Sequence, residues 1–391
     1  MYKEADTKQL NRSGKKRMAN LELLRIFSMM LVVTLHFLGK GDNLPGLAEE
    51  HWDATGYAAW GLESLAIVAV NVYMLISGYF LIESSFKVKR LLQLLLQICF
   101  YSFGVAVIAA LFGYMPAEGF TLYYLQMILL PVSMHHYWFM TAYVYMYVFS
   151  PLISAGIKQL SKKQLQVVIV LLLAIFSAMK SVAPVILGAD MNGYDFDWYL
   201  CVFVIAAYIR LYGIPFFKNK RRSLFVYLLS AAGIFGVTMG IRFVYFKRGN
   251  LATILSICYT YNHILVLMAA VGLFYLFYHM RLKEGVFSRI VCTIAPYTLG
   301  VYLWHENVAI RYEWVHWLYN LTGQPNGIPS LLILTVLAVA AIFIIGILLD
   351  MLRSLCFKIA HRLLSFSGCY RRLQQWLDGL TIGEGKGCMN E

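Results

Sequence analysis

The sequence predicts an all-α helical bundle that is embedded in a membrane, with about ten transmembrane helices. Of the 391 residues, 60% are hydrophobic and 14% are charged, whereas a soluble protein has about 45–50% apolar and about 25% charged residues. The mean hydropathy is +0.66. The apolar residues gather in runs of roughly 18–25, the length with which an α-helix crosses a bilayer. Together these observations exclude a large soluble enzyme, a disordered chain and a collagen-like protein.

Ten apolar segments follow one another along the chain. The first is too long for a removable signal peptide and lacks a small-residue cleavage site. The sixth is short, and an apolar piece at 123–132, between the third and fourth, is expected to form a re-entrant or interfacial helix. We expect spans near 20–39, 57–82, 91–114, 137–155, 165–182, 197–212, 223–246, 255–280, 288–311 and 329–352.

Lysine and arginine are unevenly distributed between the two sets of loops. The two terminal tails and the loops on their side hold 25 of the 33 basic residues, and the opposite loops hold three. The positive-inside rule therefore predicts that both termini are cytoplasmic. The same asymmetry accounts for much of the net charge of +13 without a nucleic-acid partner. The seven cysteines show no metal-ligand spacing and no disulfide framework, so we expect no metal.

The chain is expected to consist of a basic N-terminal tail (1–19), a transmembrane domain (20–352) and a basic C-terminal tail (353–391). Within 353–377, leucine, phenylalanine and tryptophan alternate with basic residues at roughly helical spacing. This pattern favours a helix that lies on the inner leaflet, with a solvated tail as the alternative. The glycine-rich end of the chain is expected to be disordered.

The first predicted span carries a group of ionisable residues: Glu22, Arg25 and His36. Charges at membrane depth cost ~3 kcal/mol each on insertion scales and therefore tend to be functional. Glu22 and Arg25 are three residues apart and can pair on one helix face. Arg25 and His36 are three turns apart on the same side, about 16 Å along the axis. An imidazole deep in the bundle can take a proton from a hydroxyl, but Arg25 as a snorkelling anchor and His36 as an interhelical contact remain open.

The pattern Glu22-x-x-Arg25-x10-His36 resembles the signature of the membrane-bound type-3 acyltransferases, which include O-acetyltransferases of surface carbohydrates. Four further segments are similar to those of this family and occur in its order. The sequence departs from the family in having Glu22 where Asp is more usual, and in lacking a proline-containing basic run after Arg90. The four segments are 71–80 (NVYMLISGYF), 86–90 (FKVKR), 137–152 (YWFMTAYVYMYVFSPL) and 297–305 (YTLGVYLWH).

This resemblance implies a membrane-embedded O-acyltransferase. The acyl donor is acyl-CoA, most often acetyl-CoA, from the cytoplasm, and the acceptor is a hydroxyl of an extracytoplasmic or lipid-linked carbohydrate. His36 is implied as the general base, and Arg25, held in place by Glu22, is implied to bind a phosphate or the thioester region of the donor. The resemblance implies no bound cofactor. The implied substrate-binding residues are Ser77, Tyr79, Lys87, Arg90, Trp138, Tyr143, Tyr302 and His305.

Each of these positions also has a structural interpretation. Aromatic residues at helix ends are common interface anchors, and basic residues after a span follow the positive-inside rule. His305 is equally compatible with a buried, hydrogen-bonded histidine. His135 and His136 are expected on the outer face, near the acceptor. The sequence assigns no partner to four further residues near membrane depth, Glu63, Arg210, Arg242 and Glu306.

The resemblance and the absence of eukaryotic targeting features favour a bacterial plasma membrane. Because neither end resembles a soluble acyl-carrying domain, direct transfer to the acceptor is expected, and relay to a separate protein is the alternative. A second hypothesis is a carrier for serine or sugar, since relatives of this family form the membrane half of amino-acid racemase systems. A carrier is expected to have two corresponding halves, and no such repeat is evident. A purely structural scaffold leaves the first-span Glu-Arg-His group unexplained.

Overall fold

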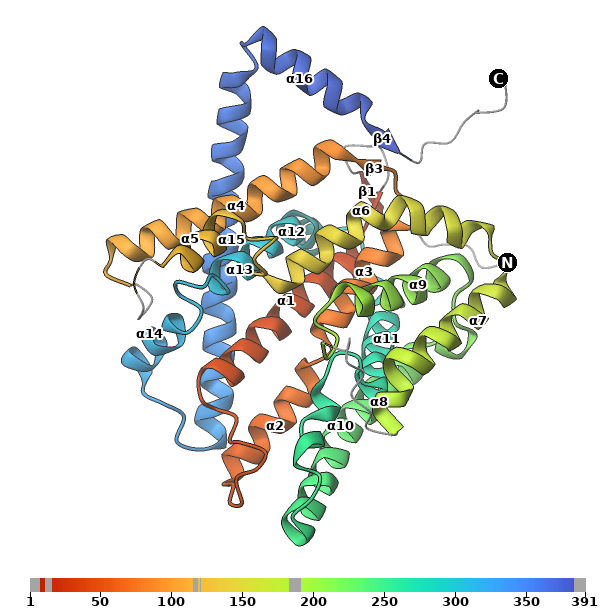
Figure 1. Cartoon of the computed structure of the whole chain (residues 1–391), viewed down its shortest axis with the longest axis vertical. Coiled ribbons are helices and arrows are strands. Elements are labelled where there is room, and N and C mark those ends of the chain that lie inside the picture. Colours follow the sequence, from red (N-terminus) through yellow and green to blue (C-terminus); the bar gives the residue numbers. More distant parts are fainter. Residues whose placement is uncertain (1–7, 11–15, 115–118, 120, 183–190, 383–391) are drawn as a thin grey trace.

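The structure is a computed structural model that describes residues 8–10, 16–114, 119, 121–182 and 191–382. Within these residues, nine helical segments are long and apolar enough to cross a membrane. Figure 1 shows them packed into one bundle, which confirms a polytopic all-α fold. The nine segments are Ala19–Lys40, Ala54–Leu81, Val88–Leu111, Trp138–Gln159, Lys162–Val182, Lys220–Arg248, Ala252–Tyr278, Val286–His305 and Ile328–Leu364.

A tenth helix, α9 (Phe196–Tyr212), lies where the sixth span is expected and is 17 residues long. It covers about 25 Å at 1.5 Å per residue, somewhat less than the hydrocarbon core of a bilayer. Most of its side chains are buried, including Trp198 and Tyr199 at its start. It is therefore an interior helix of the bundle, as short as the sequence predicts.

Five of the nine segments are single α-helices, and the other four are interrupted. A proline, Pro296, stands at one of the breaks, where it cannot donate a backbone hydrogen bond. The uninterrupted helices are α1 (Ala19–Lys40), α4 (Val88–Leu111), α6 (Trp138–Gln159), α10 (Lys220–Arg248) and α15 (Ile328–Leu364). The first interrupted segment consists of α2 (Ala54–Ala66) and α3 (Ala69–Leu81), and the second of α7 (Lys162–Leu173), the π-helix η1 (Ala174–Ala178) and α8 (Met179–Val182). The third consists of η3 (Ala252–Ile254), η4 (Ile257–Tyr259) and α11 (Ile264–Tyr278). The fourth consists of α12 (Val286–Ile294), η5 (Ala295–Tyr297) and α13 (Thr298–His305).

The remaining elements are short. The apolar piece at 123–132 begins with an eight-residue helix rather than a span. These elements are β1 (Lys8–Leu10), β2 (Lys16–Met18), β3 (Phe86–Lys87), α5 (Leu122–Leu129), η2 (Pro215–Phe217), α14 (Glu313–Thr322), α16 (Gly368–Gly379) and β4 (Thr381–Ile382).

Helix α1 runs through the middle of the bundle (Figure 1) and contacts α2, α3, α11, α12, α13 and α15. Leu24, Val33, Phe37 and Leu38 of α1 are fully buried in the hydrophobic core. The helix that carries the predicted Glu-Arg-His group is thus surrounded by protein on most sides. A polar side chain on α1 therefore faces other helices more often than lipid.

Helix α13 packs closely on α15 at Gly300. A Cβ atom at Gly300 would lie 2.3 Å from the Cβ atom of Asp350, so only glycine allows this approach. Asp350 is fully buried, and one of its carboxylate oxygens accepts hydrogen bonds from Gln97, Tyr101 and Arg353. This contact fixes α13, the helix that ends in His305, against the longest helix of the bundle.

The C-terminal part of the chain differs from the expected single surface helix. Helix α15 continues past the expected end of the span at 352 and has 37 residues, about 55 Å and far more than a bilayer core. Helix α16 then leads back toward α4 (Figure 1). Residues 381–382 form β4, antiparallel to β3, so this part of the glycine-rich end is ordered, and 383–391 lie outside the described residues.

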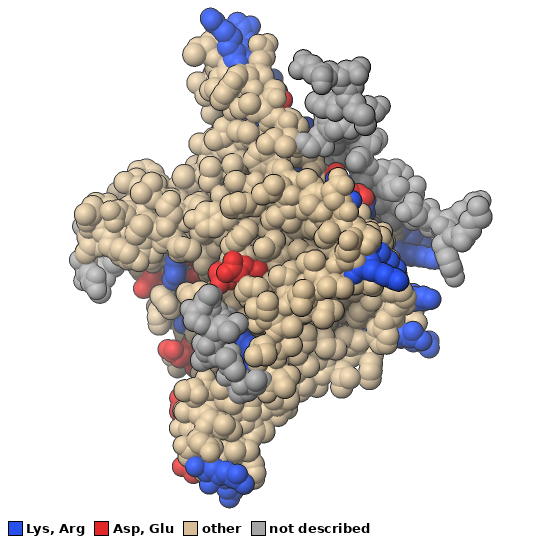
Figure 2. All heavy atoms as spheres, turned by 45° about the vertical axis from the view of Figure 1, so that its right-hand side comes forward, with Lys and Arg blue, Asp and Glu red and all other residues tan. Residues whose placement is uncertain are grey.

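The outer surface is poor in charge. Figure 2 shows one face on which most of the area carries neither acidic nor basic side chains, and the charged residues form a few separate groups. Large apolar side chains such as Leu96, Ile108 and Val336 are more than half exposed. Such a surface suits a protein surrounded by lipid.

Candidate active site

A cavity of about 290 Å³ lies inside the bundle. It has room for on the order of ten water molecules, which fits an acyl group and part of an acceptor rather than a complete nucleotide-containing donor. Its wall is largely apolar and aromatic, as is usual for a small-molecule site. Six of the residues singled out in the sequence line it: Arg25, His36, Ser77, Trp138, Tyr143 and Tyr302.

Arg25 and His36 line this cavity from the same face of α1, as their eleven-residue spacing predicts. The expected ion pair is also present, with Arg25 Nη1 2.7 Å from Glu22 Oε2. Tyr73 on α3 donates a hydrogen bond of 2.9 Å to the Arg25 carbonyl. Arg25 is thus held at one place in the wall, and its other side-chain nitrogens have no hydrogen-bond partner among the described residues.

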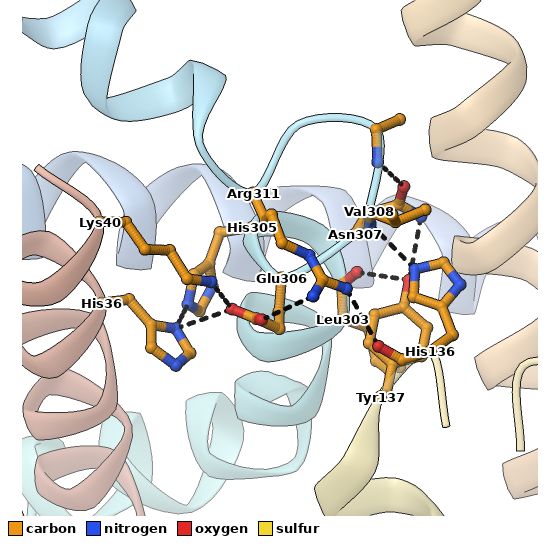
Figure 3. A network of polar contacts seen from close by, with 11 residues as sticks. His36, Lys40, His136, Tyr137, Leu303, His305, Glu306, Asn307, Val308 and Arg311 are labelled. Atoms are coloured by element: carbon orange, nitrogen blue, oxygen red, sulfur yellow. Dashed lines mark hydrogen bonds and ion pairs between the residues drawn. The ribbon is translucent and has the colours of Figure 1, made fainter. Parts of the chain in front are cut away.

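The imidazoles of His36 and His305 are joined by a hydrogen bond, with His36 Nδ1 2.8 Å from His305 Nε2. His305 is fully buried, and its Nδ1 lies 2.5 Å from the carbonyl oxygen of Val301. Because a carbonyl only accepts, His305 Nδ1 carries the hydrogen, and in the neutral ring Nε2 is an acceptor. His36 Nδ1 must then be the donor. This arrangement leaves the lone pair on His36 Nε2, the nitrogen that Figure 3 shows turned away from the network.

Glu306, the residue after His305, brings charge to the same place. Its Oε2 lies 3.1 Å from His36 Nδ1 and forms an ion pair with Lys40. Arg311 Nη1 lies 3.8 Å from its other oxygen. A carboxylate beside the imidazole stabilises the imidazolium that forms when the ring takes up a proton.

Helical spacing in the sequence does not identify Lys40 and Arg311 as site residues, and it assigns no partner to Glu306. Lys40 follows His36 by four residues and therefore lies on the same helix face. Glu306 and Arg311 flank the turn after α13. Only the packing of α13 on α1 brings these two segments together, which explains why spacing alone did not reveal the contact.

His36, His305 and Glu306 place three potential metal-ligand atoms within 4.8 Å of one another. Two cations, Lys40 and Arg311, already face the Glu306 carboxylate. A divalent cation would be repelled by both, and His305 Nε2 would have to give up its hydrogen bond to His36. These three side chains therefore fit a hydrogen-bonded network better than a metal site.

A second network holds α6 against the end of α13 (Figure 3). Tyr137 donates to the Leu303 carbonyl at 2.9 Å, and Asn307 Nδ2 donates to the Tyr137 hydroxyl at 3.0 Å. His136 Nε2 accepts from the backbone N–H of Val308 at 3.0 Å. His136 is buried, and burial, with Arg311 nearby, lowers its pKa to about 4. It is a neutral, buried residue of this network, and its expected place on the outer face near the acceptor stays a prediction.

Four of the expected binding residues do not line the cavity: Tyr79, Lys87, Arg90, and His305, which is joined to it only through His36. Tyr79 is buried and accepts a hydrogen bond of 3.0 Å from Arg210. Lys87 and Arg90 are exposed at the start of α4, and the Lys87 backbone is fixed by Tyr147, whose hydroxyl accepts from its N–H at 3.2 Å. Among the described residues, no contact joins Tyr79, Lys87 or Arg90 to His36, and their role in substrate binding stays a prediction.

The other charges near membrane depth have separate environments. Arg210 pairs with Glu83. Arg242 donates to the backbone carbonyls of Leu47, Glu49 and Glu50 and stacks over Trp52. Glu63 has one buried carboxylate oxygen without a hydrogen-bond partner among the described residues. Arg210 and Arg242 thus serve the packing of loops and helices rather than the cavity.

A family described as an acyltransferase domain matches residues 18–349 of the chain. The match covers most of the sequence and includes every residue that lines the cavity. The chain belongs to the acyltransferase 3 family. It is therefore a membrane acyltransferase. No curated protein sequence and no solved structure matches this acyltransferase.

Proposed function

We propose that the protein transfers an acyl group, most simply acetyl, from acyl-CoA to a hydroxyl of a carbohydrate or lipid-linked sugar. The observation that supports this proposal best is the hydrogen-bonded pair of His36 and His305 at a cavity that also contains Arg25. The pair leaves a basic nitrogen on His36, and acyl transfer to a hydroxyl requires a base for the nucleophile.

The proposed step begins when His36 Nε2 takes the proton from the acceptor hydroxyl. The hydroxyl oxygen forms a bond to the thioester carbon, and the carbonyl π electrons move to the carbonyl oxygen. When the tetrahedral intermediate collapses, the C–S bond breaks, and the leaving CoA thiolate receives the proton from the His36 imidazolium. Glu306 stabilises that imidazolium, so the charge on His36 is balanced throughout the step.

Arg25 is proposed to bind the anionic donor. It is paired on one side with Glu22, which orients the guanidinium, and arginine binds phosphate or polarised carbonyl oxygens well. Because the cavity is small, the nucleotide part of CoA would remain outside it. The exposed Lys87 and Arg90 are candidates for attracting that part.

The proposed topology follows from the distribution of basic residues. Both termini would face the cytoplasm of a bacterial cell, and Arg25, near the start of α1, would lie toward the cytoplasmic side. His36, about 16 Å farther along the helix, would lie toward the outer side, where the acceptor arrives. This geometry favours direct transfer across the membrane over relay through a separate protein.

The test is acetyl-CoA binding and acetyl transfer by the purified protein in nanodiscs. Wild type is compared with Arg25→Ala and His36→Ala, and label from acetyl-CoA is followed into glucose and N-acetylglucosamine as model acceptors. We expect saturable binding that Arg25→Ala weakens, and transfer that His36→Ala abolishes. A folded wild-type protein that neither binds acetyl-CoA nor releases CoA would contradict the proposal. Uptake of labelled serine or glucose into vesicles would then support the carrier hypothesis.

A further inference from the structure

The proposed acyl transfer places negative charge on the carbonyl oxygen of the thioester, and enzymes stabilise that charge with preorganised hydrogen-bond donors. One part of the cavity wall has donors of this kind. Helix α6 begins at the cavity, and its first three residues, Trp138, Phe139 and Met140, all line it. The N-terminus of α6 therefore forms part of the wall of the cavity that His36 also lines.

The backbone N–H groups of these three residues form no hydrogen bond within α6. The first intrahelical bond of α6 runs from Thr141 N to Tyr137 O at 3.1 Å. Tyr137 gives no side-chain cap. The amides of Trp138 and Met140 have no hydrogen-bond partner in the described part of the chain, and the amide of Phe139 is directed toward the Tyr302 hydroxyl. A helix of 22 residues carries a partial positive charge at its N-terminus, so this end favours an anion.

Tyr302 provides an independent observation at the same place. Its side chain lines the cavity and is 5% exposed. Its hydroxyl is buried and has no hydrogen-bond partner among the described residues. The Tyr302 ring lies 6.3 Å from the Phe139 ring and 6.3 Å from the His305 ring, between centroids. An unpaired buried hydroxyl is costly, and a ligand in the cavity would satisfy it.

The two groups of donors are held in fixed relative positions. Tyr137, the residue before α6, donates to the carbonyl of Leu303, the residue after Tyr302. Asn307 donates to the Tyr137 hydroxyl and to the carbonyl of Tyr101 at 3.1 Å. These bonds, drawn in part in Figure 3, tie the start of α6 to α13. Donors that need no rearrangement are what stabilisation of an oxyanion requires.

We propose that the N-terminus of α6 and the Tyr302 hydroxyl form an oxyanion-binding site opposite His36. This proposal rests on the proposed function and adds the donors that stabilise the tetrahedral intermediate. The thioester carbonyl oxygen becomes negative when the acceptor oxygen adds to its carbon. The Tyr302 O–H and the free amides of α6 then donate hydrogen bonds to it, and neither loses its proton. The π electrons return to the C=O bond as the C–S bond breaks.

The first test is Tyr302→Phe, measured as CoA release from acetyl-CoA with N-acetylglucosamine as the acceptor. Loss of one oxyanion donor is expected to lower kcat about 100-fold, with the KM for acetyl-CoA nearly unchanged, because the bond forms only in the transition state. Tyr199→Phe is the matched control. Tyr199 is also fully buried with an unpaired hydroxyl but does not line the cavity, so its kcat should equal that of wild type.

A second pair of variants tests the backbone donors. Trp138 occupies the first helical position of α6, where proline is tolerated. Trp138→Ala and Trp138→Pro both remove the indole ring, but only proline removes the amide hydrogen. We expect kcat to fall further in Trp138→Pro than in Trp138→Ala, by about tenfold or more, with equal thermal stability.

The outcomes separate this site from the proposed function. Normal kcat in Tyr302→Phe, or an equal loss in Tyr199→Phe, would overturn the oxyanion site while His36→Ala remained inactive. A rise in the KM for acetyl-CoA at constant kcat would likewise overturn it, because it would make Tyr302 a ground-state binding group. Absence of CoA release by the wild-type protein would contradict the proposed function itself, and the oxyanion site with it.

Discussion

His36 Nδ1 lies 2.8 Å from His305 Nε2, across the contact between α1 and α13. The bond joins two residues that are 269 positions apart in the sequence. Because the Val301 carbonyl fixes the hydrogen on His305 Nδ1, the bond also fixes the tautomer of His36. A residue that does not line the cavity can thus decide which nitrogen of the proposed base faces it.

Replacement of His305 tests this relationship. His305→Ala removes the acceptor for His36 Nδ1, so we expect kcat to fall by roughly 100-fold through loss of orientation, with acetyl-CoA binding retained. His305→Gln keeps an oxygen acceptor and should recover part of the activity. Steady-state kinetics and donor binding measure the two effects. Equal activity of His305→Ala and wild type would show that His36 needs no such partner.

The Lys40–Glu306 pair should behave as a coupled unit. Removal of one partner from a buried ion pair typically costs ~3–5 kcal/mol, because the other charge remains unpaired. Glu306→Leu alone should therefore lower the melting temperature more than the double variant Lys40→Met with Glu306→Leu. Thermal unfolding in one detergent measures all the variants. Additive effects of the two substitutions would indicate that the pair is not coupled.

Gly300→Ala should destabilise the bundle. The new Cβ would lie 2.3 Å from that of Asp350, and overpacking of this kind costs ~1–3 kcal/mol. Gly104→Ala on α4 is the matched control, because nothing lies within 4 Å of a Cβ there. It should be neutral or slightly stabilising. A melting temperature for Gly300→Ala at or above that of the control would refute the close packing of α13 on α15.

His136 predicts a pH dependence of stability. Burial lowers its pKa from 6.5 to about 4 in the folded protein, so the unfolded chain binds the proton more readily between these values. Its contribution to stability is therefore present above pH 6.5 and is lost as the pH falls toward 4. Melting temperatures of wild type and His136→Gln across this range measure it. The difference between them should shrink at low pH, and a constant difference would contradict the neutral, buried state of His136.

The fold class and part of the candidate site could be predicted from the sequence. Apolar runs of membrane-spanning length predict helices directly, because a segment within lipid must pair its backbone N–H and C=O groups with one another. The placement of Arg25 and His36 on one cavity follows from helical periodicity, since both residues lie on α1. The Glu22–Arg25 pair follows for the same reason.

The contacts between helices could not be derived in this way. The pairing of His36 with His305 and of Lys40 with Glu306 depends on how α13 crosses α1, which Gly300 and Asp350 fix through packing. The extension of α15 beyond 352 was also missed, because the sequence there changes from apolar to basic while remaining helical. Hydropathy indicates where a membrane span ends. The helix itself can continue beyond that point, as long as its backbone hydrogen bonds continue.

The most direct test of the account is single-turnover release of CoA from acetyl-CoA by the protein in nanodiscs, with N-acetylglucosamine as the acceptor and with wild type and His36→Ala side by side. Donor binding and thermal stability are measured on the same samples. The account predicts that His36→Ala binds acetyl-CoA as wild type does and releases CoA at the background rate. Release at the wild-type rate from the folded variant would show that His36 is not the base.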